Sequence, residues 1–160
     1  MKMLSEMEVE KICRYGREIG EGSTRRVVLY KGRVFKVAFC GCNIENKKEV
    51  ELYLALKEQY KFLNEIYAYS KDYEVIEVEF LECDEIDEGA QELEVDNFYI
   101  PVYMEEFIDL KPWIRETLDF DFDLITEFIE MNNLDPMEIL LPTQWGINKD
   151  GKLRISDYSR

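Results

Sequence analysis

The stretch EIGEGSTRRVVLYKGRVFKVAF, residues 18–39, alternates runs of β-branched and aromatic residues with glycine-containing turns. Lys31 and Gly32 separate the apolar runs Val27–Tyr30 and Val34–Phe39, and glycine tolerates the positive φ of a tight hairpin turn. A further strand is expected just before them, around Tyr15–Ile19. The stretch therefore predicts three antiparallel strands.

The next segment changes to helical spacing. Between Asn46 and Leu63, apolar residues recur at three- and four-residue steps, and Glu49 follows Asn46 at the spacing of a capping box. After this helix, alternation returns and predicts two strands around a turn at Ser70–Asp72, with one face buried and one acidic. The residues expected on the two faces are Val75, Glu77 and Glu79 against Ile76, Val78 and Phe80.

The rest of the chain has less regular patterns. Residues 4–12 are a short amphipathic segment at the start of the chain. The charged, glycine-containing residues 83–97 are expected to form a connecting loop. A helix is predicted from about Asp121 to Asn132. The last elements are a turn at Asn148–Lys152 and a strand over Leu153–Ser156.

Composition indicates a packed protein of ordinary domain size. The chain has 160 residues, of which 46% are hydrophobic and 13% aromatic, enough to offset the entropy of ordering one core. No apolar run is long enough to span a bilayer, and the N-terminus offers no signal-peptide core. We therefore expect a cytoplasmic protein that does not act on membranes.

Absent and rare residue types exclude several kinds of site. The chain has no histidine, which removes the commonest general base and the Ser–His and Cys–His nucleophile pairs of hydrolases. Its four cysteines, which include Cys40 and Cys42, are expected to be free thiols, and the Cys40-Gly41-Cys42 spacing is a poor match for zinc.

Charge is unevenly distributed along the chain. Residues 1–60 hold 12 Lys/Arg and 9 Asp/Glu, a net charge of +3. Because the whole chain has a net charge of −15, residues 61–160 have a net charge of −18. The acidic block at residues 84–130 repels nucleic acid and favours a basic protein partner. The alternative is a solvated face that only keeps the protein soluble.

The order of these elements resembles the protein-kinase-like fold, especially small divergent kinase-like proteins of bacteria and phages. The resemblance covers residues 15–82 and 139–159. It implies one α+β domain over residues 1–160, with an N-lobe-like part at 13–83 and a reduced C-terminal part at 84–160. The N-lobe-like part would be a five-stranded antiparallel sheet with one packed helix, and the remainder a reduced helical portion with a C-terminal hairpin.

The resemblance also implies a nucleotide site for ATP with Mg²⁺. The family's strand lysine lies within a V-x-K-like pattern, here Val34-Phe35-Lys36, and its helix partner would be Glu49, with Glu51 as the second choice. An ordinary strand lysine that reaches solvent is the alternative for Lys36. The implied nucleotide-binding residues are Gly20, Gly22, Ser23, Lys36 and Glu49.

The resemblance departs from an active kinase at the end of the chain. In ILLPTQWGI, Ile139 stands where a general-base Asp is expected, and Leu141 replaces a His. Gln144 replaces a metal-binding Asn, while Asp157 keeps the identity of a metal ligand. A turn or strand cap is the alternative role for Asp157.

Three functions remain open at this point. The leading expectation is a catalytically impaired, pseudokinase-like protein of phage or mobile-element origin that acts by binding nucleotide, a protein partner or both. A second is an acidic inhibitor that mimics nucleic acid on a basic host or defence protein. A third is an active atypical kinase that uses a displaced carboxylate, Glu138 or Asp135.

Overall fold

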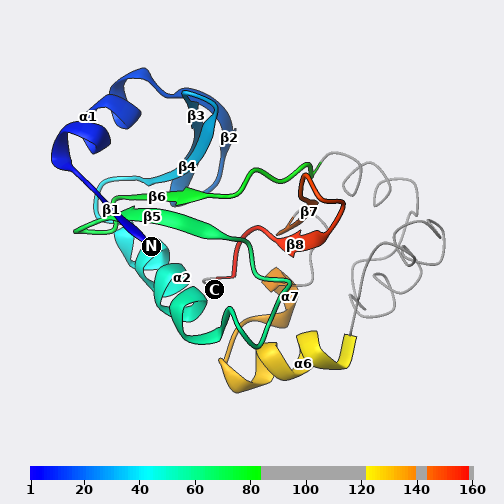
Figure 1. The fold of residues 1–160 in the computed structure, drawn as a ribbon. Helices are drawn as coiled ribbons and strands as arrows, with labels where there is room; N and C mark the ends of the chain where they lie inside the picture. Colours follow the sequence, from blue (N-terminus) through cyan, green and yellow to red (C-terminus); the bar gives the residue numbers. More distant parts are fainter. Residues whose placement is uncertain (84–121, 140–143, 159–160) are drawn as a thin grey trace. The chain divides into compact units, whose positions relative to one another are not determined.

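The computed structural model describes residues 1–83, 122–139 and 144–158, and these form an α+β structure (Figure 1). The chain divides into two compact units. The first contains Met1–Gln59 and Asn64–Phe80, and the second contains Tyr60–Leu63 and the described part of Leu81–Tyr158. The connector expected at 83–97 and the position of Leu141 lie outside the described residues, apart from Cys83. None of the described helices is long and apolar enough to cross a membrane.

A six-stranded mixed sheet forms the centre of the first unit, in the order β1-β5-β6-β4-β3-β2. All neighbouring pairs are antiparallel except β1 and β5, which are parallel. The strands are β1 (Lys2–Leu4), β2 (Arg17–Glu21), β3 (Arg25–Tyr30), β4 (Arg33–Ala38), β5 (Ile66–Ser70) and β6 (Val75–Val78).

The predicted hairpin at residues 27–39 is confirmed. Strands β3 and β4 pair in register across Lys31 and Gly32, which both take positive φ, 51° and 73°. The preceding strand is also present, although it begins at Arg17, two residues later than predicted.

The sheet has one more strand than the expected five-stranded antiparallel sheet, and this strand is parallel to its neighbour. Strands β2 to β6 give the five antiparallel members, and Lys2–Leu4 adds a sixth, parallel to β5. The amphipathic pattern suggested no strand there, because a three-residue strand leaves too few residues to show alternation.

Helix α1 (Glu6–Tyr15) covers one face of this sheet. Ser5 and Glu8 form a reciprocal capping box at its start, and the hydrogen bonds from Lys2 and Ser5 lower the pKa of Glu8 to about 2. Ile12 of the helix is buried against the sheet. The core on this side is formed by Leu4, Ile12, Val28, Phe35, Val37, Ala68 and Val75.

Helix α2 (Asn43–Leu56), labelled in Figure 1, carries Glu49, and the Glu49 side chain pairs with Lys36 of β4. The helix begins three residues before the predicted start, and its N-cap is Cys42, so the predicted cap at Asn46 was wrong. The Asn46 side chain is instead buried and donates to the backbone carbonyls of Tyr73 and Glu74, at the start of the β6 region. Asn46 therefore lies inside the helix, where its side-chain hydrogen bonds connect α2 to the segment before β6.

The predicted acidic face of β6 was also wrong. Strand β6 is an interior strand with β4 and β5 along its two edges, and both Glu77 and Glu79 are buried. Arg33 pairs with Glu77 through two hydrogen bonds, which raise the pKa of the arginine. By contrast, Phe80, which was expected on the buried face, is 58% exposed.

The second unit contains helices α6 (Phe122–Met131) and α7 (Pro136–Ile139) and the hairpin of β7 (Trp145–Ile147) and β8 (Leu153–Ile155). The predicted helix and the predicted terminal hairpin are both confirmed. A single bridge joins each outer edge of the hairpin to another segment: Glu82 pairs with Ile147, and Leu63 pairs with Ile155.

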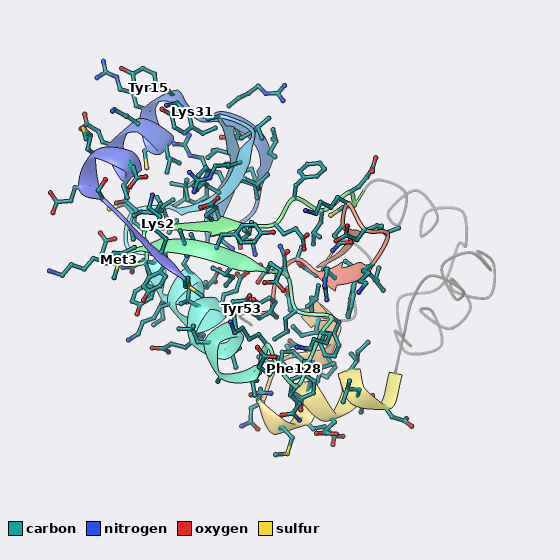
Figure 2. The ribbon with its side chains drawn as sticks, in the orientation of Figure 1. Lys2, Met3, Tyr15, Lys31, Tyr53 and Phe128 are labelled. Carbon is teal, nitrogen blue, oxygen red and sulfur yellow. The ribbon has the colours of Figure 1, made fainter. Side chains whose placement is uncertain are left out.

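Aromatic rings fill the core of the second unit. Phe128 of α6, labelled in Figure 2, lies edge-on to Tyr60 at 5.1 Å and to Phe62 at 5.4 Å between ring centroids. Trp145 is fully buried and its indole N–H donates to the carbonyl of Ile139 at 2.8 Å. Trp145 is therefore a core residue of this unit.

Candidate functional site

The predicted pairing of Lys36 with Glu49 is present in the structure. Lys36 Nζ donates to Glu49 Oε1 at 2.5 Å, from β4 to α2. Both side chains are buried, with 5% and 0% of their residue surfaces exposed. Lys36 is therefore not a strand lysine that extends into solvent. Glu51, the second choice, is exposed and lies 3.8 Å from Lys47.

Arg25 is a member of this cluster that the sequence did not reveal. Its Nη1 lies 2.7 Å from Glu49 Oε2 and donates to Asn46 Oδ1 at 2.8 Å, and the residue is 6% exposed. Among the described residues Oε2 accepts no hydrogen bond, so the contact with Arg25 is one of charge. One buried carboxylate thus faces two cations, and we call Arg25, Lys36 and Glu49 the buried triad.

A sequence signal for Arg25 does exist. In Gly20-Glu21-Gly22-Ser23-Thr24-Arg25-Arg26-Val27, Arg25 occupies the third glycine position of the kinase pattern G-x-G-x-x-G-x-V. An arginine at this position, the first of strand β3, departs from that pattern. The departure marks the position, but only the structure shows that the guanidinium turns inward.

The glycine-containing turn is closed by its own backbone. Gly22 N–H donates to the carbonyl of Arg25 at 2.8 Å, and Ser23 is exposed at the turn. Gly20 lies within β2, opposite Val27, rather than in the turn. Neither glycine has positive φ, and an added Cβ would meet its nearest atom at 3.7 Å or 3.5 Å, an ordinary contact. The hairpin itself therefore does not require glycine at either position.

Thr24 connects this turn to its surroundings. Its hydroxyl donates to Glu45 in the first turn of α2, and its carbonyl accepts from Phe39 N–H at 2.9 Å. The turn, the end of β4 and the start of α2 are thus held together by hydrogen bonds.

In the second unit, the hairpin brings the two predicted metal ligands to one end. Gln144 directly precedes β7, and its carbonyl accepts from the N–H of Ser156, the residue before Asp157. Both residues are half-buried. Across the described parts of the chain, no group of three or more Cys, Asp or Glu side chains is arranged to hold a metal ion.

The position of the expected general base holds an apolar side chain in the core. Ile139 ends α7 and is 1% exposed. The two displaced carboxylates considered as substitutes lie nearby in the chain: Asp135 is exposed just before α7, and Glu138 is half-buried within it.

A second, partly buried polar contact joins α2 to Glu65, the residue before β5. The hydroxyl of Tyr53, labelled on α2 in Figure 2, donates to Glu65. Burial is the largest cause of the raised pKa of Tyr53, followed by this hydrogen bond. The hydroxyl therefore stays protonated, and it serves as a donor that positions the helix.

No protein-family model matches this sequence, and no curated protein is significantly similar to it.

Proposed function

We propose that this chain is a kinase-like binding protein that recognises nucleotide through the buried triad and does not transfer phosphoryl groups. The main support for the proposal is the buried ion pair between Lys36 and Glu49, which joins the central strand β4 to α2. In a kinase-like site such a lysine pairs with nucleotide phosphates and such a glutamate orients it.

Two further observations support the proposal. Strands β2 to β6 form five consecutive antiparallel members with α2 in contact with β4, the arrangement expected from the resemblance. The fold does not require glycine at position 22, since a Cβ there would make only an ordinary contact. The absence of a side chain would instead allow a ligand to approach the backbone closely. Asp157 and Gln144 remain the residues expected to supply oxygen ligands to Mg²⁺.

A first prediction is that the protein does not phosphorylate itself or generic substrates. The buried Ile139 cannot orient or deprotonate an acceptor, and losing that role costs several powers of ten in rate. The measurement is transfer of radiolabelled phosphate from ATP over hours. Transfer that disappears in Asp157→Ala would contradict the prediction and favour the atypical-kinase alternative, in which case Glu138→Gln and Asp135→Asn would locate the base.

A second prediction is that Mg-ATP stabilises the folded protein. At tenfold excess over Kd, binding adds about 1.4 kcal/mol to the free energy of unfolding, which raises Tm by about 3–6 °C. Lys36→Met should abolish this rise, because the phosphates lose their cation. The matched control is Arg33→Met, which also breaks an ion pair of β4 but through a different glutamate, Glu77, and should keep the rise.

Gly22→Ala separates recognition from folding. Because a Cβ there meets only ordinary contacts, Tm without ligand should change by less than about 2 °C. The shift produced by Mg-ATP should fall if phosphates approach the turn. An unchanged ligand shift in Gly22→Ala would remove the turn from the proposed site.

The charge distribution favours a second candidate function, an acidic inhibitor that mimics nucleic acid. Residues 61–160 carry a net charge of −18, so capture of a basic partner should be fast at low salt and should weaken as the Debye length shortens to about 3 Å at 1 M. The measurement is a pull-down at low and high salt, followed by elution with DNA or RNA.

Matched charge reversals test where this attraction arises. Lysine at Glu105, Glu106 and Asp109 should slow capture of the partner. Lysine at the exposed residues Glu6, Glu10 and Glu21, which makes the same change in net charge outside the acidic block, should slow it less. Equal effects, or no salt-sensitive partner at all, would leave the block as a solvated face.

A further inference from the structure

Two thiols lie in the turn between β4 and α2. Cys40 and Cys42 flank Gly41, which takes a φ of 82°, and Cys42 N–H donates to the carbonyl of Phe39 at 2.9 Å to close the turn. Both are free cysteines; Cys40 is exposed and Cys42 is half-buried. Neither belongs to the buried triad, so the chemistry of these two thiols is independent of the proposed function.

The geometry of the turn suits a bond between these residues. Consecutive Cα atoms are about 3.8 Å apart, so a tight turn holds the Cα atoms of residues 40 and 42 roughly 5–6 Å apart, within the ~4.4–6.8 Å range of disulfides. Cys42 Sγ already lies 4.0 Å from the carbonyl oxygen of Cys40. Cys42 is the N-cap of α2 but makes no side-chain capping hydrogen bond, so rotation of its thiol breaks only the long hydrogen bond to the Cys40 carbonyl.

We propose that Cys40 and Cys42 form a reversible thiol–disulfide exchange site whose reactant is a low-molecular-weight disulfide. The Cys40 thiolate attacks one sulfur of the reactant, releases its other half as a thiolate and becomes a mixed disulfide. The Cys42 thiolate then attacks the Cys40 sulfur, expels the second half and forms the Cys40–Cys42 bond. The two cysteines give up two protons and two electrons, and the reactant disulfide becomes two thiols.

Exposure and proximity set the order of these steps. Cys40 reacts first because it is the exposed thiol, and the second step is intramolecular across a single residue. A ring this small is strained, and strained, exposed disulfides are readily reduced. The site is therefore reversible, as is typical of transient disulfides in reducing compartments.

Cys13 provides an internal comparison. It is half-buried, and burial, followed by the charge of Glu74, raises the pKa of its thiol. A raised pKa leaves less thiolate, so Cys13 should react more slowly than Cys40.

The oxidised bond would form at the start of the helix that carries Glu49. Phe39, the first residue of the turn, also donates its N–H to Thr24 in the glycine-containing turn. Hydrogen exchange of the first turn of α2 should therefore change on oxidation, while that of α1 should not.

The test treats the full chain with glutathione disulfide and follows intact mass and peptide maps. Wild-type protein should end with a Cys40–Cys42 disulfide and no retained glutathione. Cys42→Ser should stop with glutathione on Cys40, Cys40→Ser should react about tenfold or more slowly, and Cys13→Ser should match the wild type. Dithiothreitol should restore both thiols.

Two outcomes would overturn the proposal. One is a wild-type protein that keeps a stable glutathione adduct on Cys40, since Cys42 would then not close the ring. The other is modification of Cys40 no faster than that of Cys13. Serine keeps a hydroxyl donor for the bonds that the Cys13 and Cys42 thiols make to Glu74 and to the Cys40 carbonyl, so each variant should fold, and circular dichroism checks this.

Discussion

Glu49→Gln should lower the free energy of unfolding by about 3–5 kcal/mol, because it leaves two buried cations without the carboxylate that faces both. The amide keeps the size of the side chain, so the loss reports charge rather than packing. The measurement is urea unfolding, in which the midpoint falls while the slope stays constant.

The control for this variant lies on the same helix. Glu51→Gln removes an exposed carboxylate that lies 3.8 Å from Lys47, and such pairs contribute about 0.3–0.5 kcal/mol. A loss in Glu49→Gln no larger than that in Glu51→Gln would mean that the buried triad does not stabilise the first unit.

Trp145→Ala should have an effect of similar size in the second unit, a loss of about 3–5 kcal/mol. The indole is fully buried, lies 6.0 Å from the ring of Phe62 and donates to the carbonyl of Ile139. Removing it leaves a cavity and an acceptor without its donor. Hydrogen exchange of β7 and β8 should rise, which locates the loss in this unit.

Trp145→Phe separates the two contributions. It keeps most of the apolar volume but removes the N–H, so the cost should be about 1–3 kcal/mol. A Trp145→Ala variant that folds with the stability of the wild type would mean that the indole does not stabilise this core.

Local patterns explain what the sequence predicted correctly. The hairpin across Lys31 and Gly32, helix α6 and the terminal hairpin each depend on residues close together in the chain. The pairing of Glu49 with Lys36, by contrast, was predicted from the resemblance and not from a local pattern.

Non-local contacts explain what the sequence missed. Strand β1 is defined only by pairing with β5, more than sixty residues away, and the buried Glu77 pairs with Arg33, more than forty residues away. Asn46 fits the pattern of a helix cap, but carbonyls of the β6 region bind its side chain. The inward turn of Arg25 likewise depends on Glu49 and Asn46, both from another element.

The most direct test of nucleotide recognition through Lys36 is equilibrium binding of radiolabelled ATP with Mg²⁺. Dialysis measures this binding without relying on a change in protein stability. We expect saturable binding by the wild type and by Arg33→Met, and binding at least about tenfold weaker by Lys36→Met, a difference of roughly 1.4 kcal/mol. Absence of saturable binding by the wild type at millimolar ATP, or equal binding by Lys36→Met, would contradict this expectation.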